Sequence, residues 1–200
     1  RQRRRPHDLP RKLLIPEPTL RAFLSTFAGA STLLLLAACS GGGGGSSSPT
    51  YATSLSYTNP TSGSYQLVQD PASSGGTLIL DLVGPSGTAL SGVSFSLSAD
   101  TSKVSWTTPI QNGNTFNLGS APQAFLTKVS GTELQGAVAQ KGTGSPVTLG
   151  ASSVLAKVTL TLKSNVAPGT VTLVDTSKGA TLTSAGVTTA PLSIGSLSAK

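Results

Sequence analysis

Cysteine and histidine occur once each in the 200 residues, as Cys39 and His7, and methionine is absent. A nucleophilic triad needs a histidine-type base, and the usual zinc site needs cysteine or histidine ligands. Because neither residue type follows position 39, the sequence excludes both kinds of site, and any disulfide, from the rest of the chain.

Carboxylates are the remaining candidates for catalysis, and glycosidase chemistry uses two of them about 5–9.5 Å apart. The acidic residues after position 39 are Asp70, Asp81, Asp100, Glu133 and Asp175. They are scattered over expected turns, strand ends and an outward strand position, and none forms the Asp-x-Asp pattern of calcium loops. We predict a protein that is not an enzyme, with no catalytic residue, metal ligand or cofactor; calcium binding is left open.

Basic residues outnumber acidic residues by 14 to 7, but the excess lies near the beginning of the chain. The basic residues of this leader are Arg1, Arg3, Arg4, Arg5, Arg11, Lys12 and Arg21. From Cys39 onward there are seven lysines and five acidic residues, a net charge of +2, and the lysines are scattered. Binding to nucleic acid uses clustered lysine and arginine, so we predict no nucleic-acid partner.

An uncharged run of 17 residues, from Ala22 to Ala38, follows the basic leader. A helix that crosses a bilayer needs about 20 mostly apolar residues. A basic segment, a short apolar run and small residues before a cleavage site are instead typical of a secretory signal peptide.

The run ends in Leu36-Ala37-Ala38-Cys39, which resembles the lipobox of bacterial lipoproteins. The resemblance implies cleavage between Ala38 and Cys39 and transfer of a diacylglycerol to the Cys39 sulfur. The new amino group is often acylated as well, for example with palmitate. A signal peptide without lipidation, or an uncleaved anchor, is the alternative.

Stable membrane anchoring takes about two acyl chains, each methylene contributing about 0.8 kcal/mol, and a diacylated cysteine supplies them. Residues 39–50 would then form a Gly/Ser-rich linker with an end-to-end distance of roughly 20 Å. Ser40 is not an aspartate, which by analogy with lipoprotein sorting favours the outer membrane. We therefore expect a leader at 1–38, a lipidated linker at 39–50 and one domain at 51–200, attached to the bacterial cell envelope.

Residues 51–200 show the period-two alternation of half-buried strands and no segment with an extended helical period. In Gly92–Asp100, for example, Val93, Phe95, Leu97 and Ala99 face one way. The other clear strands are expected at 77–83, 103–106, 124–129, 134–139, 154–162, 170–175 and 192–197. The pair Asn112-Gly113 predicts a hairpin. About nine or ten short strands predict an all-β antiparallel sandwich or barrel.

Two of these blocks resemble cohesin modules. The first is Gly92–Asp100 with Lys103-Val104, and the second is Ser153–Lys163 with the Pro/Gly turn and strand of Ala167–Leu173. The resemblance spans about Tyr65 to Leu197. It implies a nine-stranded jelly-roll sandwich, which cohesins share with several carbohydrate-binding modules. Cohesins bind dockerin modules through one sheet face, so we expect a protein partner, whose identity the sequence does not give and for which a dockerin-like module is one candidate.

A polysaccharide partner is the first alternative, since sugars stack on exposed aromatic rings. The candidate rings are Trp106, Tyr57 and Tyr65, with Tyr51 as a further tyrosine. Large aromatic residues usually pack inside a sandwich, which favours a core position for Trp106. A structural or secretion-associated envelope lipoprotein is the second alternative, and it predicts an apolar sheet face or edge that nothing in the chain covers.

The Cys39→Ala variant tests the lipidation hypothesis. We expect its mass spectrum to show no acyl addition and the protein to leave the membrane fraction, because the alanine carries no sulfur to alkylate. A variant that retained the parent's mass increment and membrane association would contradict the lipoprotein assignment.

Overall fold

The computed structural model describes residues 48–116, 123–140, 145–176 and 179–200. The leader, Ala38, Cys39 and the linker up to residue 47 lie outside the described residues. All the named elements of the described part are β-strands, so it contains no helix long and apolar enough to cross a membrane.

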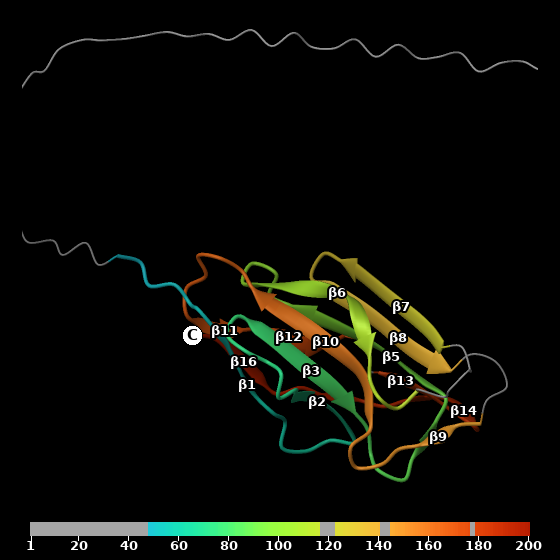
Figure 1. The fold of residues 1–200 in the computed structure, drawn as a ribbon. Helices are drawn as coiled ribbons and strands as arrows, with labels where there is room; N and C mark the ends of the chain where they lie inside the picture. Colours follow the sequence, from blue (N-terminus) through green and yellow to red (C-terminus); the bar gives the residue numbers. More distant parts are fainter. Residues whose placement is uncertain (1–47, 117–122, 141–144, 177–178) are drawn as a thin grey trace, which may run out of the picture. The chain divides into compact units, whose positions relative to one another are not determined.

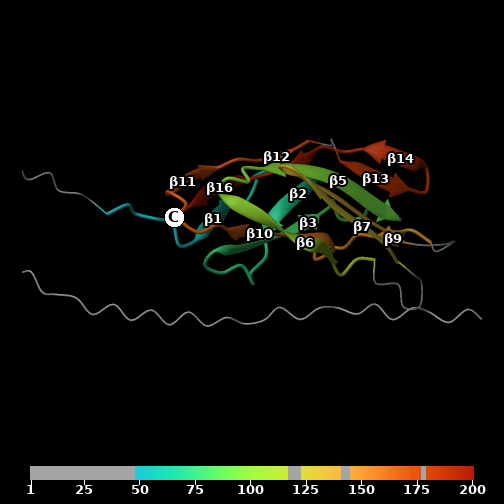
Figure 2. The ribbon, with the colours of Figure 1, turned by 90° about the horizontal axis from the view of Figure 1, so that it is seen from above.

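The strands form two main sheets, which lie as two layers face to face (Figures 1 and 2). The six-stranded sheet contains β5 (Gly92–Ala99), β7 (Gln123–Ser130), β8 (Glu133–Gln140), β12 (Leu173–Asp175), β13 (Ala180–Thr183) and β14 (Gly186–Thr189). The five-stranded sheet contains β2 (Tyr65–Gln69), β3 (Thr77–Val83), β6 (Val104–Asn112), β10 (Val154–Leu162) and β15 (Leu192–Ser193).

Two smaller sheets complete the domain. One contains β1 (Leu55–Thr58), β11 (Gly169–Val171) and β16 (Ser196–Ala199), and the other contains β4 (Ala89–Leu90) and β9 (Val147–Thr148). The β15–β2 pair is parallel, whereas the other strand pairs in the described residues are antiparallel. The expected all-β sandwich is therefore confirmed.

The core lies between the two main sheets and is formed by alternate residues of their long strands. The positions expected to face inward on β5 are all buried, as are Leu78, Leu80 and Leu82 of β3. Gly136 of β8 leaves room for the Phe95 ring, because a Cβ at this position would lie 2.4 Å from Phe95 Cζ. Alternation therefore decides which side chains enter the core.

β10 departs from the strict alternation of inward and outward side chains at its first residues. Leu155 and Ala156 are adjacent in the sequence and both fully buried, whereas Val154 is only half-buried. The register with β3 shifts between Val154 and Ala156. A β-bulge puts two residues of one strand opposite one of its partner, so the inward and outward positions exchange at this point.

The hairpin predicted at Asn112-Gly113 is wrong. β6 ends at Asn112 and pairs with β10, whereas β7 belongs to the other sheet and pairs with β8. The chain after β6 instead stays against β10, where the side chain of Asn114 accepts a hydrogen bond from the Val154 amide at 2.7 Å. This local bonding with β10 replaces the reversal that the dipeptide favours.

Two segments expected as single strands are each divided between two sheets. In 170–175 the division falls at Thr172, so that β11 pairs with β16 and β12 pairs with β5. In 192–197 it falls after Ser193, where β15 pairs with β2 and β16 continues in the small sheet. These two crossings add two strand segments, and further short strands, among them β4, β9, β13 and β14, bring the described part to sixteen rather than about nine or ten.

The Leu134→Ala and Leu126→Ala variants test the position of the core. Leu134 is fully buried and Leu126 is 57% exposed on the neighbouring strand. Removing a buried leucine leaves a cavity, so we expect Leu134→Ala to lower the free energy of unfolding by about 2–5 kcal/mol. Leu126→Ala should change it by less than about 0.5 kcal/mol. Equal losses in urea unfolding would contradict the assignment of the two faces.

Candidate interaction face

The outer face of the six-stranded sheet is where apolar residues gather outside the core. Strand register defines rows of residues across this face, each row crossing neighbouring strands. One row runs through Val187, Leu182, Gly92 and Ala139, and the next runs through Thr189, Ala180, Ser94, Ala137 and Leu126. We call these two rows the apolar half of the outer face.

The apolar half contains a hollow of about 160 Å³. Small residues of adjacent strands line its floor, namely Gly92, Ser94, Ala137, Ala139 and Ala180. Gly92 adds no side chain to the floor of the hollow. A Cβ at this position would lie 2.8 Å from the Cβ of Ala139. Leu182 and Val187 line one side of the hollow.

The large apolar side chains around the hollow are open to solvent. Val187 is 71% exposed, Leu182 is 39% exposed and Leu126 is 57% exposed. Leu126 belongs to β7 and lies directly opposite Ala137 of β8. Single exposed apolar residues are common on protein surfaces, but a contiguous patch is typical of an interaction site. The apolar half is contiguous by strand register and therefore the best candidate for a binding surface.

A polar half adjoins the apolar half on the same face. Ser96 donates a hydrogen bond to the Glu133 carboxylate, and Thr176 donates to Ser96 Oγ at 3.1 Å. Hydrogen bonds from Ser96, and then from Gln135, hold the pKa of Glu133 below its ordinary value. Glu133 is therefore negatively charged at neutral pH, and the side chains hydrogen-bonded around it are uncharged.

The aromatic residues expected to stack on sugar are mostly inside the fold. Tyr57 and Tyr65 are 8% and 7% exposed, so the stacking role is wrong for both: neither presents a ring face to a ligand. Tyr57 Oη donates to the Leu67 carbonyl at 3.0 Å and accepts from the Gly195 amide at 2.7 Å. Burial raises the pKa of both tyrosines.

Trp106 is half-buried and packs against the core, and its Nε1 donates to the Thr132 carbonyl at 3.0 Å. Among the tyrosines of the domain, only Tyr51 is exposed, at 46%. The candidate rings therefore do not form the exposed, coplanar set that a sugar-binding platform requires.

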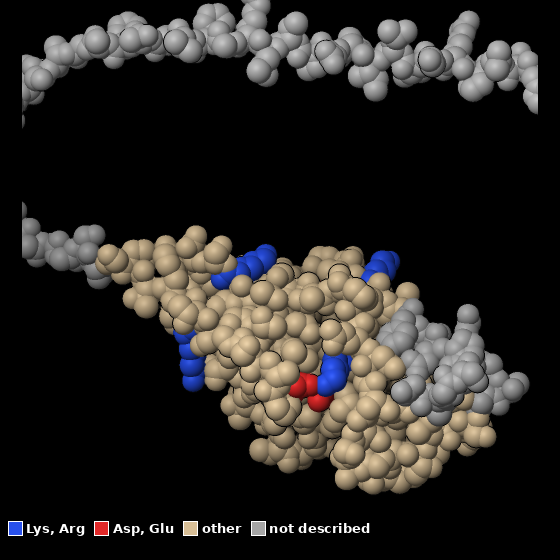
Figure 3. All heavy atoms as spheres, in the orientation of Figure 1, with Lys and Arg blue, Asp and Glu red and all other residues tan. Residues whose placement is uncertain are grey.

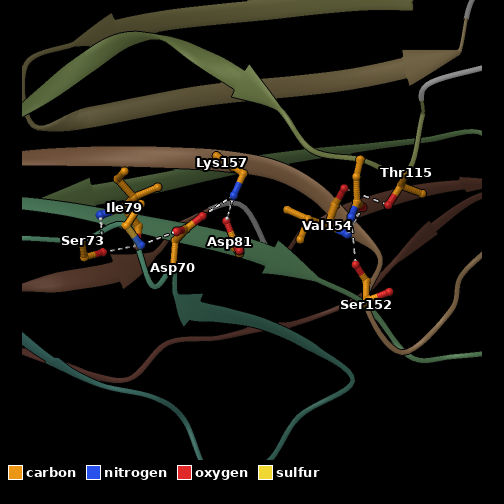
Figure 4. A network of polar contacts seen from close by, with 10 residues as sticks. Asp70, Ser73, Ile79, Asp81, Thr115, Ser152, Val154 and Lys157 are labelled. Carbon is orange, nitrogen blue, oxygen red and sulfur yellow. Dashed lines mark hydrogen bonds and ion pairs between the residues drawn. The ribbon is translucent and has the colours of Figure 1, made fainter.

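A second polar cluster, which the sequence pattern missed, lies on the outer side of the five-stranded sheet (Figure 4). Lys157 of β10 contacts Asp81 of β3 and Asp70, which follows β2. The alternation of each strand already placed Lys157 and Asp81 outward. Their meeting could not be predicted because it depends on which strands pair.

The surface around this cluster carries few charges. On the face shown in Figure 3, charged side chains are separated by wide uncharged areas, and acidic groups lie beside a basic one. Within the described residues no group of three or more His, Cys, Asp or Glu is placed to hold a metal ion.

No protein-family model matches this chain, and no curated protein matches it. Among solved structures it is similar to the type II cohesin A11 from Bacteroides cellulosolvens, with a TM-score of 0.50 and 14% identity over 68% of this chain and 98% of that one.

Two other cohesins are similar at lower scores. The sixth cohesin from Acetivibrio cellulolyticus scaffoldin B, solved in complex with a Cel5 dockerin, has a TM-score of 0.47 and 19% identity over 68% of this chain and 97% of that one. The cohesin module of a Clostridium perfringens family 33 glycoside hydrolase has a TM-score of 0.42 and 16% identity, covering 76% of this chain and 97% of that one. The two facing sheets and the similarity to the Bacteroides cellulosolvens cohesin show that the fold is a cohesin-like β-sandwich.

The Tyr57→Phe and Tyr51→Phe variants test the structural role of Tyr57. Removing the Tyr57 hydroxyl leaves the buried Leu67 carbonyl and Gly195 amide without this partner, so we expect a loss of about 1–3 kcal/mol in unfolding free energy. Tyr51→Phe, at an exposed ring, should stay within about 0.5 kcal/mol of the parent. A Tyr57→Phe protein with unchanged stability and impaired glycan binding would restore the stacking hypothesis.

Proposed function

We propose that this protein is a non-catalytic docking module of the bacterial cell envelope, anchored by lipid at Cys39. Its partner is a protein, which it binds through the outer face of the six-stranded sheet. The observation that carries the proposal is the apolar half of that face, with its hollow of about 160 Å³.

The chemistry of the apolar half favours a protein over a polysaccharide. Its floor and walls are aliphatic, from Ala137 and Ala139 to Leu182 and Val187. Aliphatic side chains of a partner gain by leaving water here, roughly 25 cal/mol for each Å² of apolar area buried. Sugars instead need aromatic ring faces and many hydrogen-bonding groups, and the rings of Tyr57 and Tyr65 are buried.

The polar half would orient such a partner. Ser98 and Gln135 offer hydroxyl and amide groups, and Glu133 and Lys128 offer one charge of each sign. Charged and polar groups at the rim of an interface fix its register and select among partners more than they add affinity. A protein module with exposed apolar side chains, for which a dockerin is the candidate, fits this division of the surface.

The proposed location in the cell envelope rests on the leader and on Cys39. Two acyl chains on the cysteine give stable anchoring, and the linker up to residue 50 lets the domain move near the membrane surface. Ser40 supports the outer membrane as the final location. A tethered domain meets partners in the same envelope layer at a raised effective concentration.

A permanent subunit of an envelope assembly is the second candidate function. The same uncovered apolar half favours it, since obligate interfaces are more apolar than transient ones. The two functions differ in whether the partner dissociates: a docking module releases its partner, whereas an obligate subunit does not.

Binding measurements with Ala137→Arg and Thr159→Arg test the docking face. Ala137→Arg places a long charged side chain on the hollow floor, so we expect affinity for dockerin modules or for a partner purified from envelope extract to fall about 30-fold or more, the effect of a hot-spot change of about 2 kcal/mol. Thr159→Arg, on the outer side of the five-stranded sheet, should bind like the parent. Specific retention on polysaccharide, equal in all three proteins, would reject the proposal.

A further inference from the structure

Lys157 lies between two carboxylates on the outer side of the five-stranded sheet (Figure 4). The register of β10 and β3 places it directly opposite Asp81. Its Nζ donates a hydrogen bond to Asp81 Oδ1 at 2.9 Å and is in direct contact with Asp70 Oδ2. The side chains of Asp70 and Asp81 are 12% and 11% exposed, against 28% for Lys157.

The Asp70 carboxylate is held in this position by its own loop. Its Oδ1 accepts a hydrogen bond from the Ala72 amide at 2.7 Å, which leaves Oδ2 turned toward Lys157. The Asp70 amide donates to the Ile79 carbonyl at 2.9 Å, and Ser73 Oγ accepts from the Ile79 amide at 2.9 Å. The loop after β2 is thus fastened to β3, and the carboxyl carbon is fixed beside the amine.

We propose that Lys157 and Asp70 condense into an intramolecular amide, with Asp81 carrying the proton between them. The product is a covalent cross-link between β10 and the loop after β2. It is independent of the docking function proposed above, since the site lies on the other sheet.

The atoms of the condensation balance without an oxidant or a cofactor. One Nζ proton of Lys157 passes through Asp81 to Oδ2 of Asp70, which leaves a neutral amine beside a neutral carboxylic acid, and the amine then attacks Cγ of that acid. The new C–N bond forms, the Asp70 hydroxyl leaves, and it takes a second proton from Nζ, relayed by Asp81, to depart as water. An ammonium and a carboxylate become an amide and one water, and Asp81 returns to its starting state.

Two features of the site favour this reaction. Oriented groups in one molecule react with effective molarities of about 10⁵–10⁸ M, which lowers the barrier to amide formation. The exposed part of Lys157 also gives the released water a direct path to solvent.

The two carboxyls differ in pKa, and both the Lys157 ammonium and the Asp70 carboxylate have to be neutralised before they can react. The hydrogen bond from Lys157 holds the pKa of Asp70 below its ordinary value, whereas burial raises the pKa of Asp81. Asp81 is therefore the better proton acceptor of the two. The hydrogen bond to Asp70 also raises the pKa of Lys157, so the amine needs an adjacent base, and Asp81 is within hydrogen-bond distance.

Intact-mass measurement of the purified protein tests the cross-link. We expect the measured mass of the parent to be one water below the mass calculated from its sequence. The Lys157→Arg variant should instead have the full mass calculated from its own sequence. Arginine keeps the positive charge but has no nucleophilic amine, so this variant separates the amide from a plain ion pair. Circular dichroism checks that both proteins are folded.

Tryptic peptides locate the bond. Amidation blocks cleavage after Lys157, so peptide 142–163 should appear joined to the peptide that ends at Lys103. Asp70 and Asp81 lie in that same peptide, and fragment ions that break the chain between them should place the link on Asp70. A link on Asp81 would overturn the assigned roles.

The Asp81→Ala variant tests the proton carrier. General acid–base groups contribute about 10²–10⁴-fold to rate, so we expect linked protein to accumulate at least about 100-fold more slowly in this variant. Equal rates overturn the role of Asp81. A folded parent at full mass, or a water loss that persists in Lys157→Arg, overturns the cross-link and leaves the docking proposal unaffected.

Discussion

The packing of two sheets against each other is the constraint on which the rest of the domain depends. No cysteine follows position 39, so burial of apolar side chains has to provide most of the stabilisation. Each strand in the sandwich gives alternate residues to the core and frees the others for the surface. The same division that buries Phe95 and Leu97 also places Ser96 and Ser98 on the outer face.

The two outer faces use this freedom differently. On the six-stranded sheet, one half carries small and aliphatic residues around a hollow, and the other half carries hydroxyls and Glu133. On the five-stranded sheet, the outward positions bring Lys157 and two carboxylates together. Neither arrangement contributes to the core, so both can be altered without repacking it.

Sequence pattern predicted the long strands well because alternation is a local property. The segments 77–83 and 154–162 coincide with β3 and β10. The pattern failed where the chain changes sheets, as at Thr172 and after Ser193, because both neighbouring strands keep the same alternation. It also failed at Asn112-Gly113, where hydrogen bonds to β10 outweigh the turn preference of the dipeptide.

The candidate sites were less predictable than the fold because each depends on strand order. Ala137 and Leu182 are ordinary small and apolar residues in the sequence, and they lie on one patch only because β8 and β13 both pair with β5. Lys157 is likewise 76 residues from Asp81 along the chain. Tyr57 and Tyr65 were misassigned because a residue's type does not say on which side of its strand it lies.

The pairing of β1 with β16 has a mechanical consequence. With an anchor at Cys39, a pull from a docked partner reaches the membrane through β1, whose strand partner is β16. Release of Leu55–Thr58 from this small sheet would lengthen the linker by roughly 13 Å. The hydroxyl of Tyr57 ties β1 to the Leu67 carbonyl of β2, so this hydrogen bond adds to the pairing with β16 in resisting the release of β1.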